Sequence, residues 1–264
     1  METRIRDHIW IWGHMENMWY PYIHRETHVT PMQGVAYMDA KNLLYGGGEF
    51  EWDKAAEYEA SRNLPAVGWC IERAAKEPEN VTELCEAAKK YPNIRMGMFD
   101  DFFSMTNPTN NYTNYTPEML AKYRAQLHEA GVAMWVVLYT QNFPQMDAET
   151  IQMYLKEFDG VSLWYWEEEE ADLHFDEHME YFLKLAADKR RMVGCYVYNF
   201  DQGKEARPEV VEKQLDKNAA LLKNGSVEGV ILLSNAMFGT NPPFEAVERA
   251  KAWMDAHGDE KICR

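Results

Sequence analysis

The sequence predicts an α/β fold that is best described as a single (β/α)8 TIM barrel with a long loop after the first strand. Short apolar runs alternate with amphipathic segments along the whole chain, and this order is typical of a parallel sheet. The chain has 264 residues, and a closed barrel of this kind needs about 250. No Pro-rich or Ser-rich linker interrupts the pattern, so we expect residues 1–264 to form one domain.

The predicted strands are nearly continuous apolar runs. Such runs are typical of strands that are buried on both faces of a parallel sheet. In chain order, the strands are expected to begin near His8, Gly34, Ala66, Ile94, Val132, Gly160, Val193 and Gly229.

Helices are predicted between most of these strands, and several carry clear start signals. Thr116 precedes Pro117, which places a capping side chain before a proline at the first helical position. Gly131 and Gly225 follow helical segments and indicate where these helices end. The clearest helices span Asp53–Asn63, Val81–Tyr91, Pro117–Ala130, Ala148–Phe158, Asp176–Lys189, Pro208–Lys223 and Pro243–His257.

The region between the first strands is the least regular. Met15–Pro31 is rich in aromatic and charged residues and is predicted to be a long loop. Lys41–Gly48 could extend a hairpin or form a loop over the barrel mouth. No Gly-Lys-Ser/Thr follows its three glycines, so a phosphate-binding P-loop is disfavoured.

The charge of the chain argues against polyanionic partners. The formal net charge is −16 and no Lys/Arg cluster is present. Binding to nucleic acid or to an anionic membrane needs such clusters, so neither partner is expected. The four cysteines form no CxxC pair, which favours a reducing compartment and a cytoplasmic location.

Two adjacent carboxylates follow the apolar run that begins at Ile94. In a parallel barrel Asp100 and Asp101 would lie at the carboxyl end of a strand, where active sites form. Neighbouring carboxylates repel each other, and this separates their pKa values as general acid–base chemistry requires. Side chains alternate along a strand, so either one of the two faces the pocket or a bulge turns both inward. The alternative function of the pair is to cap the next segment.

The other predicted strand ends carry acids, amides and aromatic rings. Carboxylates and amides bind vicinal hydroxyl groups, and aromatic faces cover the apolar side of a sugar ring. The chain has 9 Trp and 15 Tyr, which is consistent with such a site. The predicted substrate-binding residues are Trp12, His14, Asn42, Glu72, Tyr139, Gln141, Trp166, Tyr198, Asn199, Asp201 and Asn235.

Asp101 is the predicted general acid because it lies farther toward the mouth than Asp100. Asp100 would then orient the substrate or perturb its neighbour. Glu167 is the predicted second carboxylate, although it could equally be the first charge of a solvated acidic run. A separation of ~5 Å between the carboxyl groups of Asp101 and Glu167 would indicate retention, and ~6.5–9.5 Å inversion.

The segment Met98-Phe99-Asp100-Asp101-Phe102 resembles the fourth strand of (β/α)8 β-N-acetylglucosaminidases of the O-GlcNAcase type. In that family one aspartate polarises the acetamido group of the substrate, which attacks the anomeric carbon, and the next aspartate is the acid/base. The resemblance implies the first role for Asp100 and the second for Asp101. It does not extend to the first strand, Trp10–His14.

The sequence therefore predicts a glycoside hydrolase that needs no cofactor and no metal. One alternative is a metal-dependent sugar isomerase, epimerase or hydrolase, in which Glu72, Asp100, His14 and Glu167 would supply the ligands of Mn²⁺ or Mg²⁺. Another is a non-catalytic carbohydrate-binding barrel. In every case the expected ligand is a small molecule or an oligosaccharide.

Overall fold

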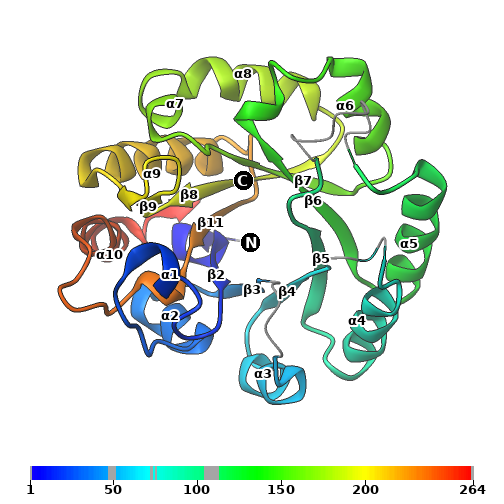
Figure 1. Cartoon of the computed structure of the whole chain (residues 1–264), viewed down its shortest axis with the longest axis horizontal. Helices are drawn as coiled ribbons and strands as arrows, with labels where there is room; N and C mark the ends of the chain where they lie inside the picture. The colour runs from blue at the N-terminus through cyan, green and yellow to red at the C-terminus, as the bar shows by residue number, and fades with distance from the viewer. Residues whose placement is uncertain (1, 47–51, 72–73, 75, 104–112, 263–264) are drawn as a thin grey trace.

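Eight parallel strands form a closed barrel, which confirms the predicted fold class (Figure 1). The structure, a computed structural model, describes residues 2–46, 52–71, 74, 76–103 and 113–262. Around the barrel the strands follow the order β11-β2-β3-β4-β5-β6-β7-β8, so β11 closes the sheet against β2. They are β2 (Ile9–Gly13), β3 (Asn42–Tyr45), β4 (Ala66–Cys70), β5 (Ile94–Phe99), β6 (Ala133–Tyr139), β7 (Gly160–Trp164), β8 (Arg190–Tyr196) and β11 (Gly229–Leu233).

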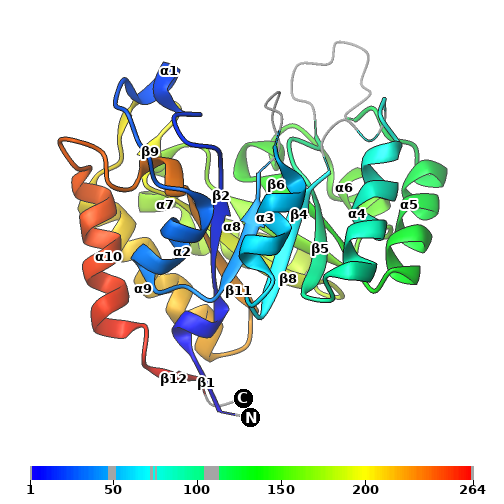
Figure 2. The ribbon, with the colours of Figure 1, turned by 90° about the horizontal axis from the view of Figure 1, so that it is seen from below.

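Helices surround the barrel and cover the outer face of the sheet (Figure 1). In the side view, α1 (Tyr20–Ile23) lies at one end of the barrel, and both chain termini lie at the other (Figure 2). There β1 (Thr3–Arg4) pairs with β12 (Lys261–Ile262). The other helices are α2 (Pro31–Met38), α3 (Lys54–Ser61), α4 (Glu79–Lys90), α5 (Pro117–Glu129), α6 (Ala148–Leu155), α7 (Glu168–Leu173), α8 (Phe175–Leu185), α9 (Pro208–Lys223) and α10 (Glu245–His257).

Large indole rings fill part of the barrel interior, and glycines on the neighbouring strands make room for them. Trp135 on β6 and Trp164 on β7 are almost wholly buried. A Cβ atom added to Gly160 would lie 2.4 Å from the Trp135 ring, and one added to Gly194 would lie 2.0 Å from the Trp164 ring. Any larger residue at either glycine would displace an indole, so these positions fix the packing beneath the mouth.

The strand predicted near Gly34 is wrong, because this segment forms helix α2. The side chain of Thr30 accepts a hydrogen bond from the backbone N–H of Gln33, and the Gln33 side chain accepts one from the Thr30 N–H. Pro31 occupies the first helical position. This capping box starts a helix that packs against β2. The second strand is instead Asn42–Tyr45, within the segment for which a hairpin or a loop was predicted.

The long loop after the first strand is confirmed, with one short helix inside it. Residues 14–30 are irregular except for turns and α1, which spans Tyr20–Ile23. Asn17 and His24 have φ angles of 59° and 51°, and these reverse the chain on either side of α1. Among the described helices, none combines the length and apolar character that a membrane span requires.

Candidate active site

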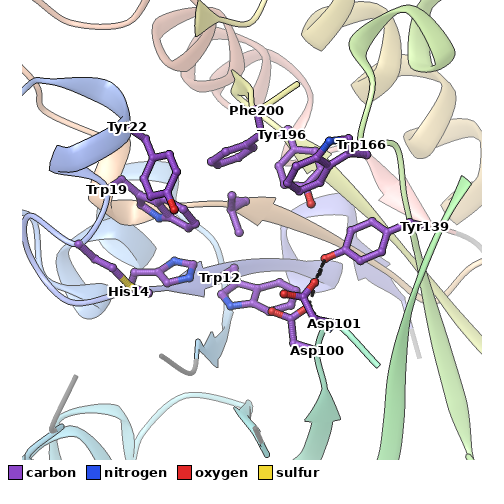
Figure 3. A pocket seen from close by; sticks show the side chains of 12 residues that line it. Trp12, His14, Trp19, Tyr22, Asp100, Asp101, Tyr139, Trp166, Tyr196 and Phe200 are labelled. Carbon is purple, nitrogen blue, oxygen red and sulfur yellow. Dashed lines mark hydrogen bonds between the residues drawn. The ribbon is translucent and has the colours of Figure 1, made fainter. Parts of the chain in front are cut away.

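A cavity of about 360 Å³ opens at the carboxyl ends of the barrel strands (Figure 3). Its walls come from the residues at or just after the ends of six strands, from the loop that carries α1, and from the turn after β9 (Tyr198–Asn199). Active sites of (β/α)8 enzymes occupy this end of the barrel. The lining residues are Trp12, His14, Met18, Trp19, Tyr22, Asp100, Asp101, Tyr139, Trp166, Tyr196, Phe200 and Leu233.

Asp100 and Asp101 both line the cavity because the chain turns sharply where β5 ends. Asp101 has a φ angle of 44°, in the left-handed region that non-glycine residues seldom occupy. Its backbone N–H donates to Oδ1 of Asp100 over 2.9 Å. This turn breaks the alternation of a regular strand, so two consecutive carboxylates face one space. Holding a non-glycine residue in such a conformation costs about 1–3 kcal/mol and is seen most often at functional sites.

The hydroxyl of Tyr139, at the end of β6, binds both carboxylates. It lies 3.0 Å from Oδ1 of Asp101 and 3.3 Å from Oδ1 of Asp100. Burial, and then the charge of Asp100, hold the pKa values of Tyr139 and Tyr196 well above the usual range. Both phenols are therefore protonated at neutral pH and can donate a hydrogen bond toward the aspartates or a ligand.

Aromatic rings form the remaining walls. The rings of Trp166 and Phe200 stack with centroids 5.8 Å apart, and Tyr196 packs edge-on against Phe200 at 5.3 Å. Trp19, from the loop after β2, closes the wall with its centroid 5.0 Å from that of Phe200. A cavity with these faces and one carboxylate pair therefore presents both apolar and polar walls to a ligand.

His14 lies in the same cavity and is only 5% exposed. Its ring is parallel to that of Trp12, with centroids 6.3 Å apart, and packs edge-on against Trp19 at 5.1 Å. Burial lowers the pKa of His14 to about 3, against a smaller opposing effect of the Trp12 carbonyl. The imidazole is therefore neutral at physiological pH and offers one donor and one acceptor.

Asn235, a predicted substrate-binding residue, does not line the cavity and instead positions His14 from behind. Its Oδ1 accepts from the His14 backbone N–H at 2.7 Å. Its Nδ2 donates to the carbonyls of His14 at 2.9 Å and of Val29 at 2.6 Å. The side chain is fully buried, and these contacts use its donor and acceptor groups to fix the start of the long loop.

Asn42 lies at the opposite end of the barrel, so its predicted place at the mouth is also wrong. It is the first residue of β3, and its side chain donates to the backbone carbonyls of Asp7 and Ile9. The error follows from the misplaced second strand. Because the real strand begins at Asn42 rather than ending before it, the residue faces the amino end of the sheet.

The predicted residues after β8 lie beside the cavity rather than in it. Tyr198 is 3% exposed, and its hydroxyl donates to the backbone carbonyl of Tyr22 at 3.0 Å, which ties it to α1. Asn199 accepts from the backbone N–H of Gln202 in a tight turn that leads to β10 (Lys204–Glu205). Asp201 is exposed in the same turn and is absent from the cavity wall. Tyr196 and Phe200 line the cavity where Tyr198 was expected.

Gln141 and Glu167 line a second cavity of about 650 Å³ outside the first. Glu167 is exposed and precedes α7, so the alternative interpretation of a solvated acidic run fits its position. Glu167 is not among the residues that line the cavity with the aspartates, so the structure does not bring it together with Asp101, its predicted partner. Glu72 lies outside the described residues.

Several lining residues were not predicted from the sequence. Met18, Trp19 and Tyr22 lie in the long loop, whose aromatic content was the available signal. Tyr196 is the last residue of β8, and its place at the carboxyl end of that strand was the available signal. Leu233 ends β11. Phe200 follows two residues that were predicted, and nothing in the local sequence marks it.

No group of three or more His, Cys, Asp or Glu side chains among the described residues is arranged to hold a metal ion. Glu72, one of the ligands considered for a metal site, lies outside those residues, while Glu167 is in the second cavity. The described part of the chain therefore does not assemble the four predicted ligands at one point.

The fold and the cavity define a (β/α)8 barrel protein with a carboxylate pair in an aromatic pocket. No protein-family model matches the chain, and no curated protein matches it. Among solved structures, a mutant tryptophan synthase alpha-subunit from Pyrococcus furiosus has 12% identity and a TM-score of 0.54, with 96% of this chain and 97% of that chain covered.

Two further structures are similar over most of the chain. A protein described as "a putative alpha-L-fucosidase" from Bacteroides thetaiotaomicron has 8% identity and a TM-score of 0.59, with coverage of 87% of this chain and 88% of that one. 3-Dehydroquinate dehydratase from Geobacillus kaustophilus has 10% identity, a TM-score of 0.51, and coverage of 97% and 96%. At such low identity these likenesses establish the barrel fold alone.

Proposed function

We propose that this chain is a glycoside hydrolase in which Asp100 and Asp101 act together on a sugar that carries a 2-acetamido group. The observation that carries the proposal is the sharp turn at Asp101, which brings both carboxylates into one aromatic cavity. The resemblance of Met98–Phe102 to the O-GlcNAcase type supports the same roles for the two residues.

The position of the pair favours a substrate-assisted mechanism. Ordinary retaining and inverting enzymes place two carboxyl groups on opposite sides of the scissile bond, about 5 Å or about 6.5–9.5 Å apart. Among the described residues that line the cavity, the carboxylates are Asp100 and Asp101, which are consecutive and share the hydroxyl of Tyr139. A nucleophile supplied by the substrate removes the need for a carboxylate on the opposite face.

In the first step, Asp101 gives its proton to the glycosidic oxygen while the acetamido oxygen attacks the anomeric carbon. The glycosidic C–O bond breaks and the alcohol leaves. Asp100 binds the acetamido N–H and stabilises the positive charge that develops on the cyclic intermediate. In the second step, water attacks the anomeric carbon, its proton passes to Asp101, and the bond to the acetamido oxygen breaks. The sugar is released with retained configuration.

A panel of 4-nitrophenyl α- and β-glycosides, including the N-acetylhexosaminides, tests the proposal. Turnover of an N-acetylhexosaminide, but not of the corresponding glycoside with a 2-hydroxyl group, is the expected result. A thiazoline made from the same sugar, which mimics the cyclic intermediate, should then inhibit. Equal turnover of both glycosides would leave a hydrolase without acetamido participation, and no turnover of any glycoside would contradict the proposal.

A further inference from the structure

Three aromatic side chains of the cavity wall carry ring nitrogens that have no partner among the described residues. Nε1 of Trp12, Nδ1 of His14 and Nε1 of Trp19 are buried and make no hydrogen bond within the part of the chain that the structure describes. All three side chains line the cavity that contains the aspartates. Buried polar groups are hydrogen-bonded in most folded proteins, so three unpaired ones in a single wall require an explanation.

The packing around Gly46 explains why Nε1 of Trp12 has no partner among the described residues, whereas the His14 nitrogen that faces this glycine is Nε2 and not the unpaired Nδ1. A Cβ atom added to Gly46 would lie 2.7 Å from both Nε2 of His14 and Nε1 of Trp12. The two rings thus rest against the bare Cα of a glycine, which provides neither a donor nor an acceptor. The Trp12 carbonyl is close enough to affect the pKa of His14 but does not satisfy Nδ1.

The wall is positioned rigidly although its nitrogens are unpaired. Asn235 clamps the backbone of His14 through its N–H and its carbonyl. The ring itself is held parallel to Trp12 and edge-on to Trp19. In the close-up, His14 and Trp19 lie on one side of the cavity, the aspartates and Tyr139 lie on the other, and Trp12 lies between them (Figure 3).

We propose that His14, held between the rings of Trp12 and Trp19, binds a hydroxyl group of an uncharged sugar ring, away from the bond that is cleaved. This inference rests on the proposed function and adds a specificity-determining residue to it. A neutral imidazole nitrogen either donates to a hydroxyl group or accepts from it, depending on the tautomer of the ring. The described lining residues include no Lys or Arg, so a sugar carboxylate or sulfate would find no counter-charge.

Binding of free sugars to the Asp101→Asn protein tests this inference without turnover. The probes are N-acetyl-D-glucosamine and its 3-deoxy, 4-deoxy and 6-deoxy analogues, measured by isothermal titration calorimetry. Removal of one of these hydroxyl groups should weaken binding about tenfold, as expected for the loss of a hydrogen bond to a buried group. In the protein that also carries His14→Phe, the same deoxygenation should change the affinity less than twofold, because its partner is already gone.

Two controls separate this role from a structural one. His174→Phe replaces a histidine outside the cavity and should leave the discrimination against the deoxy analogue intact. His14→Gln, which keeps a donor and an acceptor, should restore part of the discrimination. The inference would be overturned if removal of each hydroxyl group lowered the binding affinity by the same factor with and without His14.

The outcome also distinguishes this inference from the proposed function. If the protein hydrolyses glycosides but the loss of affinity for each deoxy analogue is the same with and without His14, the inference is overturned and the proposed function stands. Discrimination that depends on His14, in a wild-type protein that cleaves no glycoside, would support the inference and contradict the proposed hydrolysis. Failure of every probe to bind would overturn the inference.

Discussion

The hydroxyl of Tyr139 lies 3.0 Å from Oδ1 of Asp101 and hydrogen-bonds it, and the same hydroxyl contacts Asp100 at 3.3 Å. Tyr139 ends β6, whereas the aspartates follow β5, so this contact joins the ends of two neighbouring strands. The phenol remains protonated because burial and the charge of Asp100 raise its pKa. A single donor therefore orients both carboxylates at the cavity wall.

Replacement of Asp101 by Asn should lower kcat/KM by about 10²–10⁴-fold for glycosides with a poor leaving group, because the proton donor is lost. The loss should be much smaller for a dinitrophenyl glycoside, whose leaving group needs little protonation. Steady-state kinetics on both substrates measures this difference. Asp188→Asn, a change at an exposed aspartate far from the cavity, is the control and should affect neither substrate. Equal losses for the two leaving groups would rule out a role as general acid.

Tyr139→Phe removes the shared donor and should lower kcat/KM by about 10–100-fold, since hydrogen bonds to charged groups contribute about 1.5–3 kcal/mol. The effect should fall mainly on kcat, because the hydroxyl holds the reacting carboxylates. Tyr165→Phe is the matched control: this buried tyrosine donates to the Phe175 carbonyl outside the cavity. It should lower thermal stability but leave kcat unchanged. A kcat for Tyr139→Phe equal to that of the wild type would contradict the positioning role.

The stability of the protein should fall in mildly acidic solution because of His14. Its pKa is about 3 in the folded state, below the ordinary value of 6.5, so the unfolded chain binds the proton more tightly. The contribution of His14 to the free energy of unfolding is fully present above pH 6.5 and is lost as the pH falls toward 3. Between about pH 7.5 and about pH 5 the loss amounts to roughly 2 kcal/mol.

Urea denaturation at these two pH values measures the effect. In His14→Phe, the pH dependence of the free energy of unfolding should be smaller by that amount. Identical pH dependence in wild type and His14→Phe would show that His14 does not stay neutral in the folded protein.

Gly160→Ala should destabilise the barrel by about 1–3 kcal/mol, because the added methyl group would overlap the buried Trp135 ring. Trp135→Leu also destabilises the protein, but the double variant should be more stable than the sum of the two changes predicts. Gly229→Ala is the control: its nearest contact is the flexible end of Met192 at 3.1 Å, so the loss should be smaller. Additive effects of the two substitutions in thermal denaturation would contradict this packing.

Asn235→Ala should lower stability by about 2 kcal/mol or more, because it leaves buried backbone groups of His14 and Val29 unpaired. It should also weaken sugar binding, since His14 loses its support. Asn93→Ala is the matched control: the side chain of Asn93 binds two backbone carbonyls, of Ser61 and Leu64, and lies away from the cavity. Its loss should reduce stability alone. An unchanged sugar affinity in Asn235→Ala would show that Asn235 does not support sugar binding through His14.

The barrel and its carboxylate pair were predictable because their signals are local. The run Ile94–Phe99 is apolar and is followed at once by Asp100 and Asp101, so the strand and its functional end are adjacent in the sequence. The same holds for Trp12 and Tyr139, which lie at or next to the ends of strands. A parallel barrel brings such ends together whatever the connecting helices are.

The segment around Gly34 was misassigned because its apolar pattern suits a short strand and a short helix equally well. Thr30, Pro31 and Gln33 together form a helix start that could have been recognised. The second strand begins at Asn42 and not at Gly34, so Asn42 lies at the opposite end of the barrel from the mouth, where it was predicted. One misplaced element therefore caused the error at a site residue.

The sequence alone determined the order of the barrel elements and the chemistry available at the strand ends, because both follow from local patterns of apolar and polar residues. Only the tertiary structure decided which side chains share one cavity. The left-handed backbone at Asp101 turns both aspartates inward, and Glu167 lies in a separate cavity just beyond its strand. These directions depend on single backbone angles and on long-range packing, such as that of Trp19 against Phe200, which no local pattern encodes.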